Sequence, residues 1–306
     1  CESYPAPPFF FAPPPMSDSS LPVSVEAARA AFPSGLEQPP GAYRFGMDAL
    51  LLGAWAARCL GEKAALPAVA ELGSGCGAAL FALLLHPALT RPPSQALGMD
   101  DKEELCFAAR LNAERLGLTS CRFVRGDVGD PAFLRHCGQG SFGAVLANPP
   151  FDLPGRTAAQ PLREQALRSA ARLGGQGPRT KDAPAALDLF CRAASRLLPH
   201  HGRFYVIFPA GDISRLSSAL SAARLGLRRL LPVHPDRQSP AIRLLAEARR
   251  DAAADCRLLP PLFLHAPQRG AGPAWTPEAL DFCPWLAGAG QGENLRKAQT
   301  GARRRT

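Results

Sequence analysis

The sequence has little of what marks secreted, zinc-binding or membrane-inserted proteins. Its nine cysteines are scattered and form no C-x-x-C pair, so neither a disulfide framework nor a zinc knuckle is indicated. Its six histidines are dispersed as well, and no catalytic triad or metal-ligand spacing is visible. The first twenty residues lack a basic start, and proline interrupts their apolar run, which argues against a signal peptide or membrane helix. We therefore expect a protein of the reducing cytosol that holds no metal.

Composition and charge favour one large folded domain with an anionic partner. The 306 residues can bury a sizeable core, and the hydrophobic content of 46% excludes wholesale disorder. The net charge of +9 favours a partner such as nucleic acid, although many basic proteins have no such partner. We expect a Pro-rich, disordered N-terminal extension over 1–34, a folded domain over 35–286 and a basic C-terminal tail over 287–306.

Short apolar runs alternate with helical patterns from residue 65 onward. This alternation predicts an α/β fold with a mostly parallel sheet covered by helices on both faces. Seven strands are expected at 65–72, 94–100, 121–127, 142–147, 202–210, 227–234 and 242–250. Helices are expected at 78–86, 101–118, 183–198 and 212–226, besides a leading helix within 41–56. Three cysteines fall on apolar faces and are expected in the core: Cys59, Cys106 and Cys191.

The segment ELGSGCG lies between the first expected strand and the helix that follows it. Gly73, Gly75 and Gly77 would let the backbone approach a ligand closely, and the start of the helix offers free N–H groups to it. Glu71 suits a cationic or amino-acid-bearing ligand better than a pyrophosphate, and the glycine spacing differs from the dinucleotide motif G-x-G-x-x-G. The alternative is a tight strand-to-helix turn that binds nothing.

Two acidic residues end the next two expected strands. Asp100 is placed to accept hydrogen bonds from a ribose diol, while Asp127 in the sequence RGD could accept one from an adenine amino group. Ligands of open α/β sheets bind outside the carboxyl ends of the strands, where both acids and the glycine segment fall. The alternatives are that Asp100 only loads a helix N-terminus with negative charge and that Asp127 is a turn residue.

The fourth expected strand ends in the sequence ANPPF. Two consecutive prolines can continue neither a helix nor a central strand, so Pro149 and Pro150 fix a rigid exit from the sheet. The Asn148 amide oxygen and the Pro149 carbonyl could accept both hydrogens of a planar amino group, and Phe151 offers a ring on which a base could stack. The alternative is a rigid strand-to-loop turn without a ligand.

Two further segments are not explained by core packing. Tyr43, Arg44 and Phe45 precede the leading helix, whose own apolar face is accounted for by burial. A long segment over 154–184 carries six basic residues and follows ANPPF directly. Long segments of this kind are functional loops or solvated, disordered ones, and the sequence alone does not decide between them.

These motifs together resemble known families. ELGSGCG, GMD and RGD resemble the cofactor motifs of class I S-adenosylmethionine-dependent methyltransferases, whose Rossmann-like sheet has seven strands. ANPPF resembles the N-P-P-Y/F motif of methyltransferases that act on amino groups. GAYRFGMDALLLGAW, LLPHHGRFYVIFPA, IRLLAEARR and WTPEAL are similar to the bacterial tRNA(Val) adenine-N6 methyltransferase family. The resemblance covers residues 35 to 282, about four fifths of the chain.

The resemblance implies roles for the residues that match the family motifs. Gly73, Gly75 and Gly77 would hold the methionine end of S-adenosylmethionine, with Glu71 near its amino group and Tyr43, Arg44 and Phe45 beside it. The ribose hydroxyls would bind Asp100 and the adenine Asp127. The amine that receives the methyl group would be held by Asn148 and Pro149, with Pro150 and Phe151 completing the motif. No metal is implied.

The resulting expectation is an enzyme that methylates an exocyclic amine, foremost adenine N6 in a tRNA, with RNA as its partner. A protein glutamine amide is a chemically similar acceptor, but about 40 residues before YRF cannot form the larger N-terminal helical domain typical of such enzymes. A nucleic-acid-binding relative without turnover is the other alternative, and it would have no use for ANPPF. Met47 and the sequence LPHHGR depart from the family pattern, which puts the substrate in question more than the catalysis.

Overall fold

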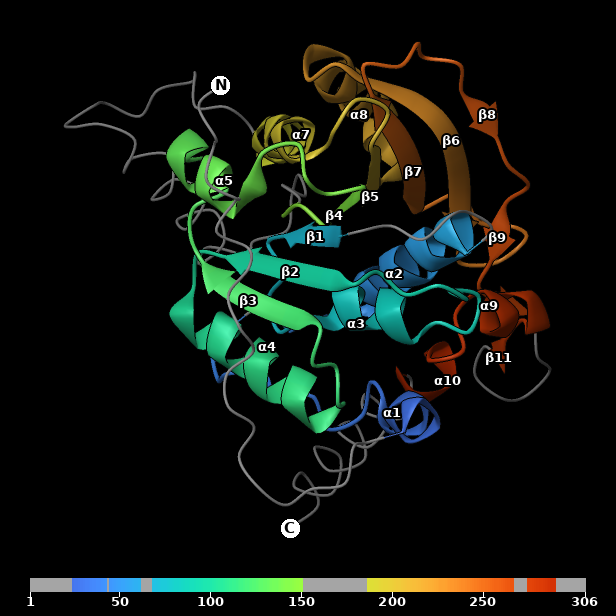
Figure 1. Ribbon diagram of the computed structural model, residues 1–306. Coiled ribbons are helices and arrows are strands. Elements are labelled where there is room, and N and C mark those ends of the chain that lie inside the picture. Colours follow the sequence, from blue (N-terminus) through green and yellow to red (C-terminus); the bar gives the residue numbers. More distant parts are fainter. Residues whose placement is uncertain (1–23, 43, 62–67, 151–185, 267–273, 290–306) are drawn as a thin grey trace.

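A mostly parallel β-sheet forms the centre of the computed structural model, which describes residues 24–42, 44–61, 68–150, 186–266 and 274–289 (Figure 1). Nine strands belong to this sheet, and seven of them run in the order β3-β2-β1-β4-β5-β7-β6. Those seven strands are β1 (Ala68–Leu72), β2 (Gln95–Asp100), β3 (Cys121–Arg125), β4 (Ala144–Ala147), β5 (Arg203–Pro209), β6 (Leu225–His234) and β7 (Arg243–Arg250).

The seven-stranded arrangement expected from the sequence is confirmed, with two short additions at one edge. β1 to β5 are parallel, and β7 is antiparallel to both of its neighbours, β5 and β6. The two-residue strands β8 (Arg257–Leu258) and β9 (Leu262–Phe263) pair with β6 and widen the sheet. A separate hairpin joins β10 (His265–Ala266) to β11 (Ala274–Trp275).

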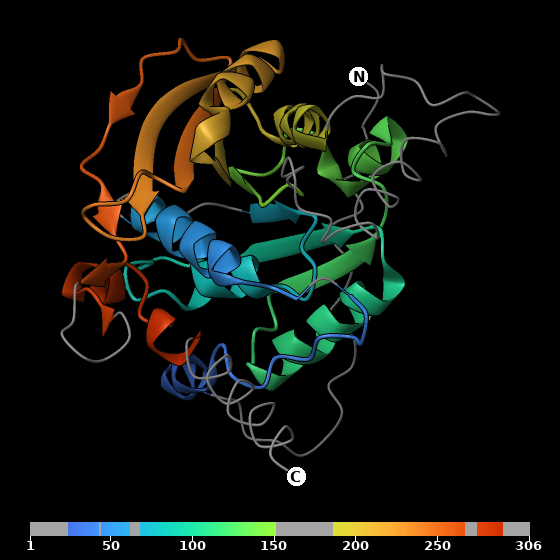
Figure 2. The ribbon, with the colours of Figure 1, turned by 180° about the vertical axis from the view of Figure 1, so that it is seen from behind.

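Helices cover both faces of the sheet (Figures 1 and 2). One layer contains α1 (Val25–Ala31), α2 (Met47–Leu60), α3 (Ala78–Leu85), α4 (Glu103–Arg115), α9 (Pro277–Phe282) and α10 (Leu286–Ala289). The opposite layer contains α5 (Pro131–Gly138), α7 (Ala186–Leu197) and α8 (Ile213–Ala222), the last preceded by the single turn η1 (Ala210–Asp212). Since the sheet is covered on both sides, β1 and β4 are buried at every position, and Glu71 in β1 is the one residue of the two strands that is not apolar.

The helices follow from their apolar patterns. α2 is buried around almost its whole circumference because it lies between the sheet and α3, α9 and α10. α7 is amphipathic and buries Leu187, Cys191 and Ala194 on one face. The expectation that Cys59, Cys106 and Cys191 lie in the core is confirmed, with exposed fractions of at most 2%.

One expectation needs correction, and one helix was missed. Residues 24–34 belong to the extension that we expected to be disordered, but Ser24 caps α1, and Ala28 and Phe32 are buried in the core. α5 was not expected from the sequence, although Asp130 caps its N-terminus and Pro131 begins it, both common helix-start signals. The folded domain thus includes residues before 35, while its limit at residue 286 stays a prediction.

Several expectations lie outside the described residues. These are the roles of Tyr43 and Phe151, the Arg-rich segment over 154–184 and the basic tail from residue 290. Among the described helices, none is long and apolar enough to cross a membrane.

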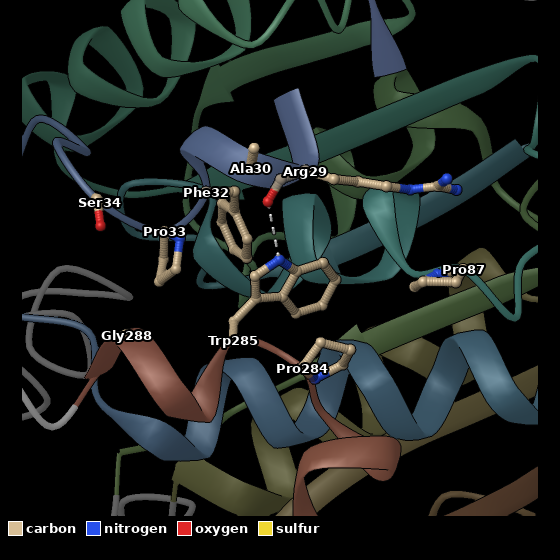
Figure 3. A pocket seen from close by; sticks show the side chains of 9 residues that line it. All are labelled: Arg29, Ala30, Phe32, Pro33, Ser34, Pro87, Pro284, Trp285 and Gly288. Atoms are coloured by element: carbon tan, nitrogen blue, oxygen red, sulfur yellow. Dashed lines mark hydrogen bonds between the residues drawn. The ribbon is translucent and has the colours of Figure 1, made fainter. Parts of the chain in front are cut away.

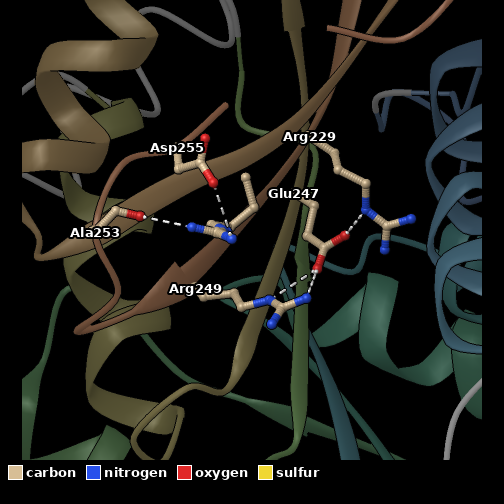
Figure 4. Close-up of polar contacts among 6 residues, drawn as sticks. Arg229, Glu247, Arg249, Ala253 and Asp255 are labelled. Atoms are coloured by element: carbon tan, nitrogen blue, oxygen red, sulfur yellow. Dashed lines mark hydrogen bonds and ion pairs between the residues drawn. The ribbon is translucent and has the colours of Figure 1, made fainter. Parts of the chain in front are cut away.

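A buried carboxylate ties the antiparallel strands together (Figure 4). Glu247 in β7 is fully buried and forms ion pairs with Arg229 in β6 and with Arg249, whose Nη2 lies 3.2 Å from Oε1 of Glu247. Arg229 also lies 5.6 Å from the ring centroid of Trp55 in α2. Arg249 lies on β7 itself, so the contact with Arg229, which is paired directly opposite Glu247, is the one that joins the two strands, and it compensates a charge that would be costly to bury unpaired.

Candidate active site

The predicted site residues come together at the carboxyl ends of four adjacent parallel strands. The glycine segment follows β1, Asp100 ends β2, Asp127 follows β3 and Asn148 follows β4. These strands are neighbours in the order β3-β2-β1-β4, so residues far apart in the sequence lie along one edge of the sheet (Figure 1). This edge is where ligands of open α/β sheets bind.

The glycine segment forms a tight turn in which only one glycine faces open space. Gly73, Gly75 and Gly77 have φ values of 63°, 54° and 89°, which other residues adopt only with strain. A Cβ at Gly77 would lie 2.6 Å from the ring of Phe81, so this glycine is required for packing. Apart from its two chain neighbours, no atom of the described residues would lie within 4 Å of a Cβ at Gly75. Gly75 is thus where a ligand can approach the backbone.

Asp100 holds this turn in place. Its Oδ2 accepts a hydrogen bond from the Gly75 N–H at 2.9 Å, and its Oδ1 accepts one from the Lys102 N–H at 3.0 Å. Burial raises the pKa of the Asp100 carboxyl to about 6, although these two hydrogen bonds act in the opposite direction. Each carboxylate oxygen can accept a second hydrogen bond, so the group can still accept donors from a ribose diol.

Glu71 lies beneath the turn rather than at its surface. The side chain is 3% exposed, and its Oε2 accepts a hydrogen bond from the Leu80 N–H in the first turn of α3 at 3.0 Å. Burial raises the pKa of Glu71 well above its ordinary value, and the nearby charge of Asp100 raises it further. Glu71 therefore joins the end of β1 to the start of α3, a role that the sequence did not reveal.

Asp127 forms a local turn beyond β3. Its Oδ1 accepts a hydrogen bond from the Gly129 N–H at 2.7 Å, which is an Asx turn. The side chain is half-buried, and no described residue donates to its second carboxylate oxygen, which can accept another hydrogen bond. The turn alternative that we considered from the sequence is thus realised, and it is compatible with a contact to a ligand.

Asn148 and Pro149 present acceptors that no other described residue uses. Asn148 is half-buried, Pro149 is buried and Pro150 is exposed directly after β4. Within the described residues, neither the Asn148 side chain nor the Pro149 carbonyl takes part in a hydrogen bond. Polar groups that are neither hydrogen bonded nor fully solvated favour a ligand with matching donors.

The segment before α2 lies against the core. Phe45 is partly buried against the apolar layer, and its N–H donates to Oε1 of Gln38 at 3.2 Å. Arg44 is exposed and has no ion-pair partner in the described part of the chain. Tyr43, the third residue expected here, is not among the described residues.

α7 adds two apolar side chains that the sequence analysis did not assign to the site. The ring of Phe190 would lie 3.1 Å from a Cβ at Gly73, and Leu189 would lie 2.8 Å from a Cβ at Gly129. The sequence contained a signal for these two residues. Near the start of α7, Leu189, Phe190 and Cys191 are apolar at three successive positions, which is more than one buried helix face requires. Phe190 is half-exposed. Its ring borders the turn at Gly73, at the carboxyl end of β1 where the site lies.

The residues at this edge fit S-adenosylmethionine. Gly75 leaves open space for a ligand beside the start of α3, and Asp100 and Asp127 each retain acceptor capacity. Asn148 and Pro149 offer unused acceptors at the neighbouring strand end. No cluster of potential metal ligands occurs among the described residues.

A cavity of about 320 Å³ lies in another part of the molecule (Figure 3). It is lined by Phe32, Pro33 and Trp285, with Arg29 and Pro284 at its sides. None of the residues predicted for methyl transfer lines it, and its described lining, which includes Arg29 and Ser34, contains none of the acids that a ribose diol would need. We therefore assign the active site to the carboxyl ends of β1 to β4, which we call the sheet edge, and not to this cavity.

Comparison with solved structures identifies the fold. The fold is similar to that of a predicted O-methyltransferase from Agrobacterium tumefaciens, with a TM-score of 0.56 and 21% identity over 78% of this chain and 96% of that one. It is also similar to a Listeria monocytogenes protein described as a class I S-adenosylmethionine-dependent methyltransferase, with a TM-score of 0.54 and 13% identity over 78% of this chain and 73% of that one. The chain therefore has the class I methyltransferase fold.

Comparison with curated proteins defines the family, although no family model matches the sequence. A tRNA1(Val) (adenine(37)-N6)-methyltransferase of Porphyromonas gingivalis is 31% identical over 228 residues, which is 72% of this chain and 80% of that protein. The enzyme of the same name from Erwinia tasmaniensis is 26% identical over 79% of this chain and 88% of its own length. The chain belongs to the tRNA1(Val) (adenine(37)-N6)-methyltransferase family.

Proposed function

We propose that this protein methylates the N6 amino group of an adenine in a tRNA. Its relatives carry this activity in their names, and the net charge of +9 suits a polyanionic substrate. The observation that carries the proposal is a pair of acceptors to which no described residue donates, the Asn148 amide and the Pro149 carbonyl, beside the open turn at Gly75. A planar amino group has two hydrogens to donate to such a pair.

Each residue at the sheet edge has a part in this proposal. S-adenosylmethionine supplies a methyl group on a positively charged sulfur, which makes that methyl strongly electrophilic. Gly73 and Gly75 would take the methionine end beside Glu71, and Asp100 and Asp127 would accept hydrogen bonds from the ribose and the adenine of the cofactor. Gly77 would shape the turn by its packing against Phe81.

The reaction would depend on alignment more than on acid–base chemistry. Asn148 and the Pro149 carbonyl would hold both N–H groups of the target amine, so that the nitrogen lone pair is directed at the methyl carbon. The N–C bond forms as the S–C bond breaks, and the surplus proton on nitrogen is lost to water. Holding the reactants in line can supply much of the rate enhancement, so no general base is required.

The RNA would have to expose its base to reach this edge. An adenine in a folded RNA is extruded from its stack before its amino group can enter a protein site, and an aromatic ring then supports it. Phe151, together with Pro150, is proposed for this part of the site, whereas Tyr43, Arg44 and Phe45 are proposed to lie beside the methionine end of the cofactor. A cytosolic location, expected from the cysteine pattern, belongs to the same proposal.

A labelling experiment tests the acceptor directly. The protein is incubated with S-adenosylmethionine carrying a labelled methyl group and with either unmodified tRNA or total cell protein. We expect label in tRNA as N6-methyladenosine, and none when Asn148→Ala replaces the wild type. Label confined to protein, as methylated glutamine, would contradict the RNA proposal while leaving the methyltransferase class intact.

A further inference from the structure

Asn112 is a polar side chain without exposed surface on the inner face of α4. Its Oδ1 accepts a hydrogen bond from the Glu37 N–H at 2.7 Å. Its Nδ2 donates to the Glu37 carbonyl and to the Cys76 carbonyl, both at 3.1 Å. One donor and two acceptors surround the amide, which settles the orientation of its oxygen and nitrogen. Asn112 thus joins two separate stretches of backbone.

Both of these stretches lead to the active site. Cys76 lies in the glycine turn, one residue after the open position at Gly75. Glu37 begins the segment that ends at Phe45, and the Phe45 N–H is in turn held by the side chain of Gln38. Asn112 is therefore connected to Gly75 through Cys76, and to Phe45 through Glu37 and Gln38.

A second residue of α4 strengthens the same connection. Arg115 lies on the next turn of the helix, and its Nη1 donates to the Gly35 carbonyl at 3.3 Å. The same nitrogen lies 3.9 Å from the Glu37 carboxylate. Because the Arg115 side chain is more than half exposed, this ion pair contributes little stability. The buried contacts of Asn112 therefore hold the segment most firmly.

The glycine turn is held from two directions. Asp100 at the end of β2 binds the Gly75 N–H, and Asn112 from α4 binds the Cys76 carbonyl one residue later. Asp100 belongs to the predicted cofactor site, whereas Asn112 lies behind the turn with no exposed surface. Asn112 can thus affect a ligand only through the position of the backbone that it holds.

We infer that Asn112 is a positioning residue for S-adenosylmethionine, because it fixes the segment ending at Phe45 against the glycine turn at Cys76. Its amide sets the separation of these two segments, so that both can contact one cofactor molecule. The inference rests on the proposed roles of Gly75 and Phe45 at the cofactor site. It does not depend on which molecule receives the methyl group.

Calorimetric binding of S-adenosylhomocysteine to Asn112→Ala tests this role without turnover. We expect the dissociation constant to rise at least about tenfold, since the loss of three hydrogen bonds releases both segments. Thr276→Val is the matched control. Thr276 is 8% exposed, and its Oγ1 donates to the Phe263 carbonyl at 2.6 Å and accepts from the Ala279 N–H at 3.0 Å, away from the sheet edge. We expect this variant to bind with an affinity within about twofold of wild type.

Either of two results would overturn the inference. One is wild-type affinity in a folded Asn112→Ala variant, and the other is an equal loss of affinity in Thr276→Val, which would indicate general destabilisation. Unmethylated tRNA would contradict the proposed acceptor but would leave this binding experiment unaffected. Failure of the wild type to bind S-adenosylhomocysteine would overturn the cofactor site and this inference together.

Hydrogen exchange on the wild-type protein provides a second measurement if Asn112→Ala does not fold. A ligand at the glycine turn should slow exchange of the Glu37 amide proton, because Asn112 couples the two segments. Unchanged exchange at Glu37, with protection at Gly75, would show that the segments are not coupled.

Discussion

Asn148 and Asp100 differ in how far the folded protein already uses their polar atoms. Both oxygens of Asp100 accept backbone hydrogen bonds, so this residue shapes the site as well as offering acceptors to a ligand. Asn148 makes no hydrogen bond to any residue in the described ranges. A substitution at Asp100 should therefore change the structure of the glycine turn, whereas one at Asn148 should change only what the site can bind.

For Asn148→Ala we expect loss of methyl transfer with cofactor binding retained. Removing one preorganised polar group from an active site typically lowers kcat by about 10²-fold or more. The affinity for S-adenosylhomocysteine should stay within about twofold of wild type, because Asn148 holds no part of the glycine turn. Single-turnover rates and calorimetry measure the two effects, and normal turnover would remove Asn148 from the site.

At Asp100 we expect a pH-dependent affinity for the cofactor. The pKa of the buried carboxyl is raised to about 6, so the ionised form that accepts hydrogen bonds from a ribose diol is lost as the pH falls below 6. Binding of S-adenosylhomocysteine should therefore weaken from pH 7 to pH 5. Asp100→Ala separates this effect from Glu71, whose pKa is also raised by burial. This variant should bind weakly and with little pH dependence, and a preserved pH profile would assign the titration to another group.

The stability of the ligand-free protein depends on pH in the opposite direction from cofactor binding. Burial raises the pKa of Asp100 above the unfolded value of 3.8, so the folded state binds a proton more tightly. The contribution of Asp100 to stability is fully present below pH 3.8 and decreases as the pH rises toward 6. Cofactor binding and Asp100 burial therefore favour opposite protonation states of the same carboxyl.

At the scale of elements, the site is assembled by strand ends and closed by helices. α7 brings Phe190 to Gly73, and α4 brings Asn112 to Cys76, so helices from opposite faces of the sheet meet the same turn. The antiparallel pair β6 and β7 lies on the other side of β5 from β4. Its buried Glu247 concerns the stability of the sheet and not the chemistry of the site.

Replacing Glu247 with Gln should destabilise the fold. The carboxylate is fully buried, while the side chains of Arg229 and Arg249 are 26% and 31% exposed and can still reach water. We therefore expect a loss of about 2 kcal/mol in the free energy of unfolding, below the usual cost of breaking a fully buried pair. Urea denaturation measures it.

The exposed ion pair between Arg58 and Asp281 provides the control for Glu247. The side chain of Asp281 is 76% exposed, so Asp281→Asn should change the free energy of unfolding by less than about 1 kcal/mol. Equal effects of the two substitutions would mean that Glu247 does not stabilise the strand pair through its buried charge.

At the scale of the whole molecule, positive charge and the open sheet edge serve different ligands. The net charge of +9 acts on a polyanion over its whole length, whereas the cofactor contacts a few residues at the ends of β1 to β4. Binding of tRNA should therefore depend steeply on salt and binding of the cofactor should not.

We expect the affinity for tRNA to fall by about 10²-fold between 50 and 200 mM salt, on the assumption of roughly four phosphate contacts. The affinity for S-adenosylhomocysteine should change by less than about twofold over the same range. Filter binding and calorimetry measure the two quantities. An equally flat salt dependence for tRNA would argue against an RNA substrate.

The sequence by itself determined the seven-stranded sheet and most of the predicted site. The spacing of apolar residues and the positions of glycine and proline are local properties of the chain. The strands, the glycine turn and the acids at the strand ends could therefore be assigned from residues near one another in the sequence. The parallel topology then placed the strand ends at one edge, because ligands of such sheets bind there. Family resemblance added the roles, which stay predictions for the individual residues.

Tertiary structure alone decided how the residues of that edge are used. The Phe81 ring fills the space that a Cβ would take at Gly77, whereas the corresponding space at Gly75 is open. Both are glycines of the same motif, so the sequence does not distinguish them. The Glu71 carboxylate accepts a hydrogen bond from the first turn of α3. Asn112 bonds to Glu37 and Cys76, which are 75 and 36 positions away from it in the chain. Asn112 was a polar residue on an apolar helix stripe, and only long-range contacts, which no local pattern contains, reveal what its amide holds.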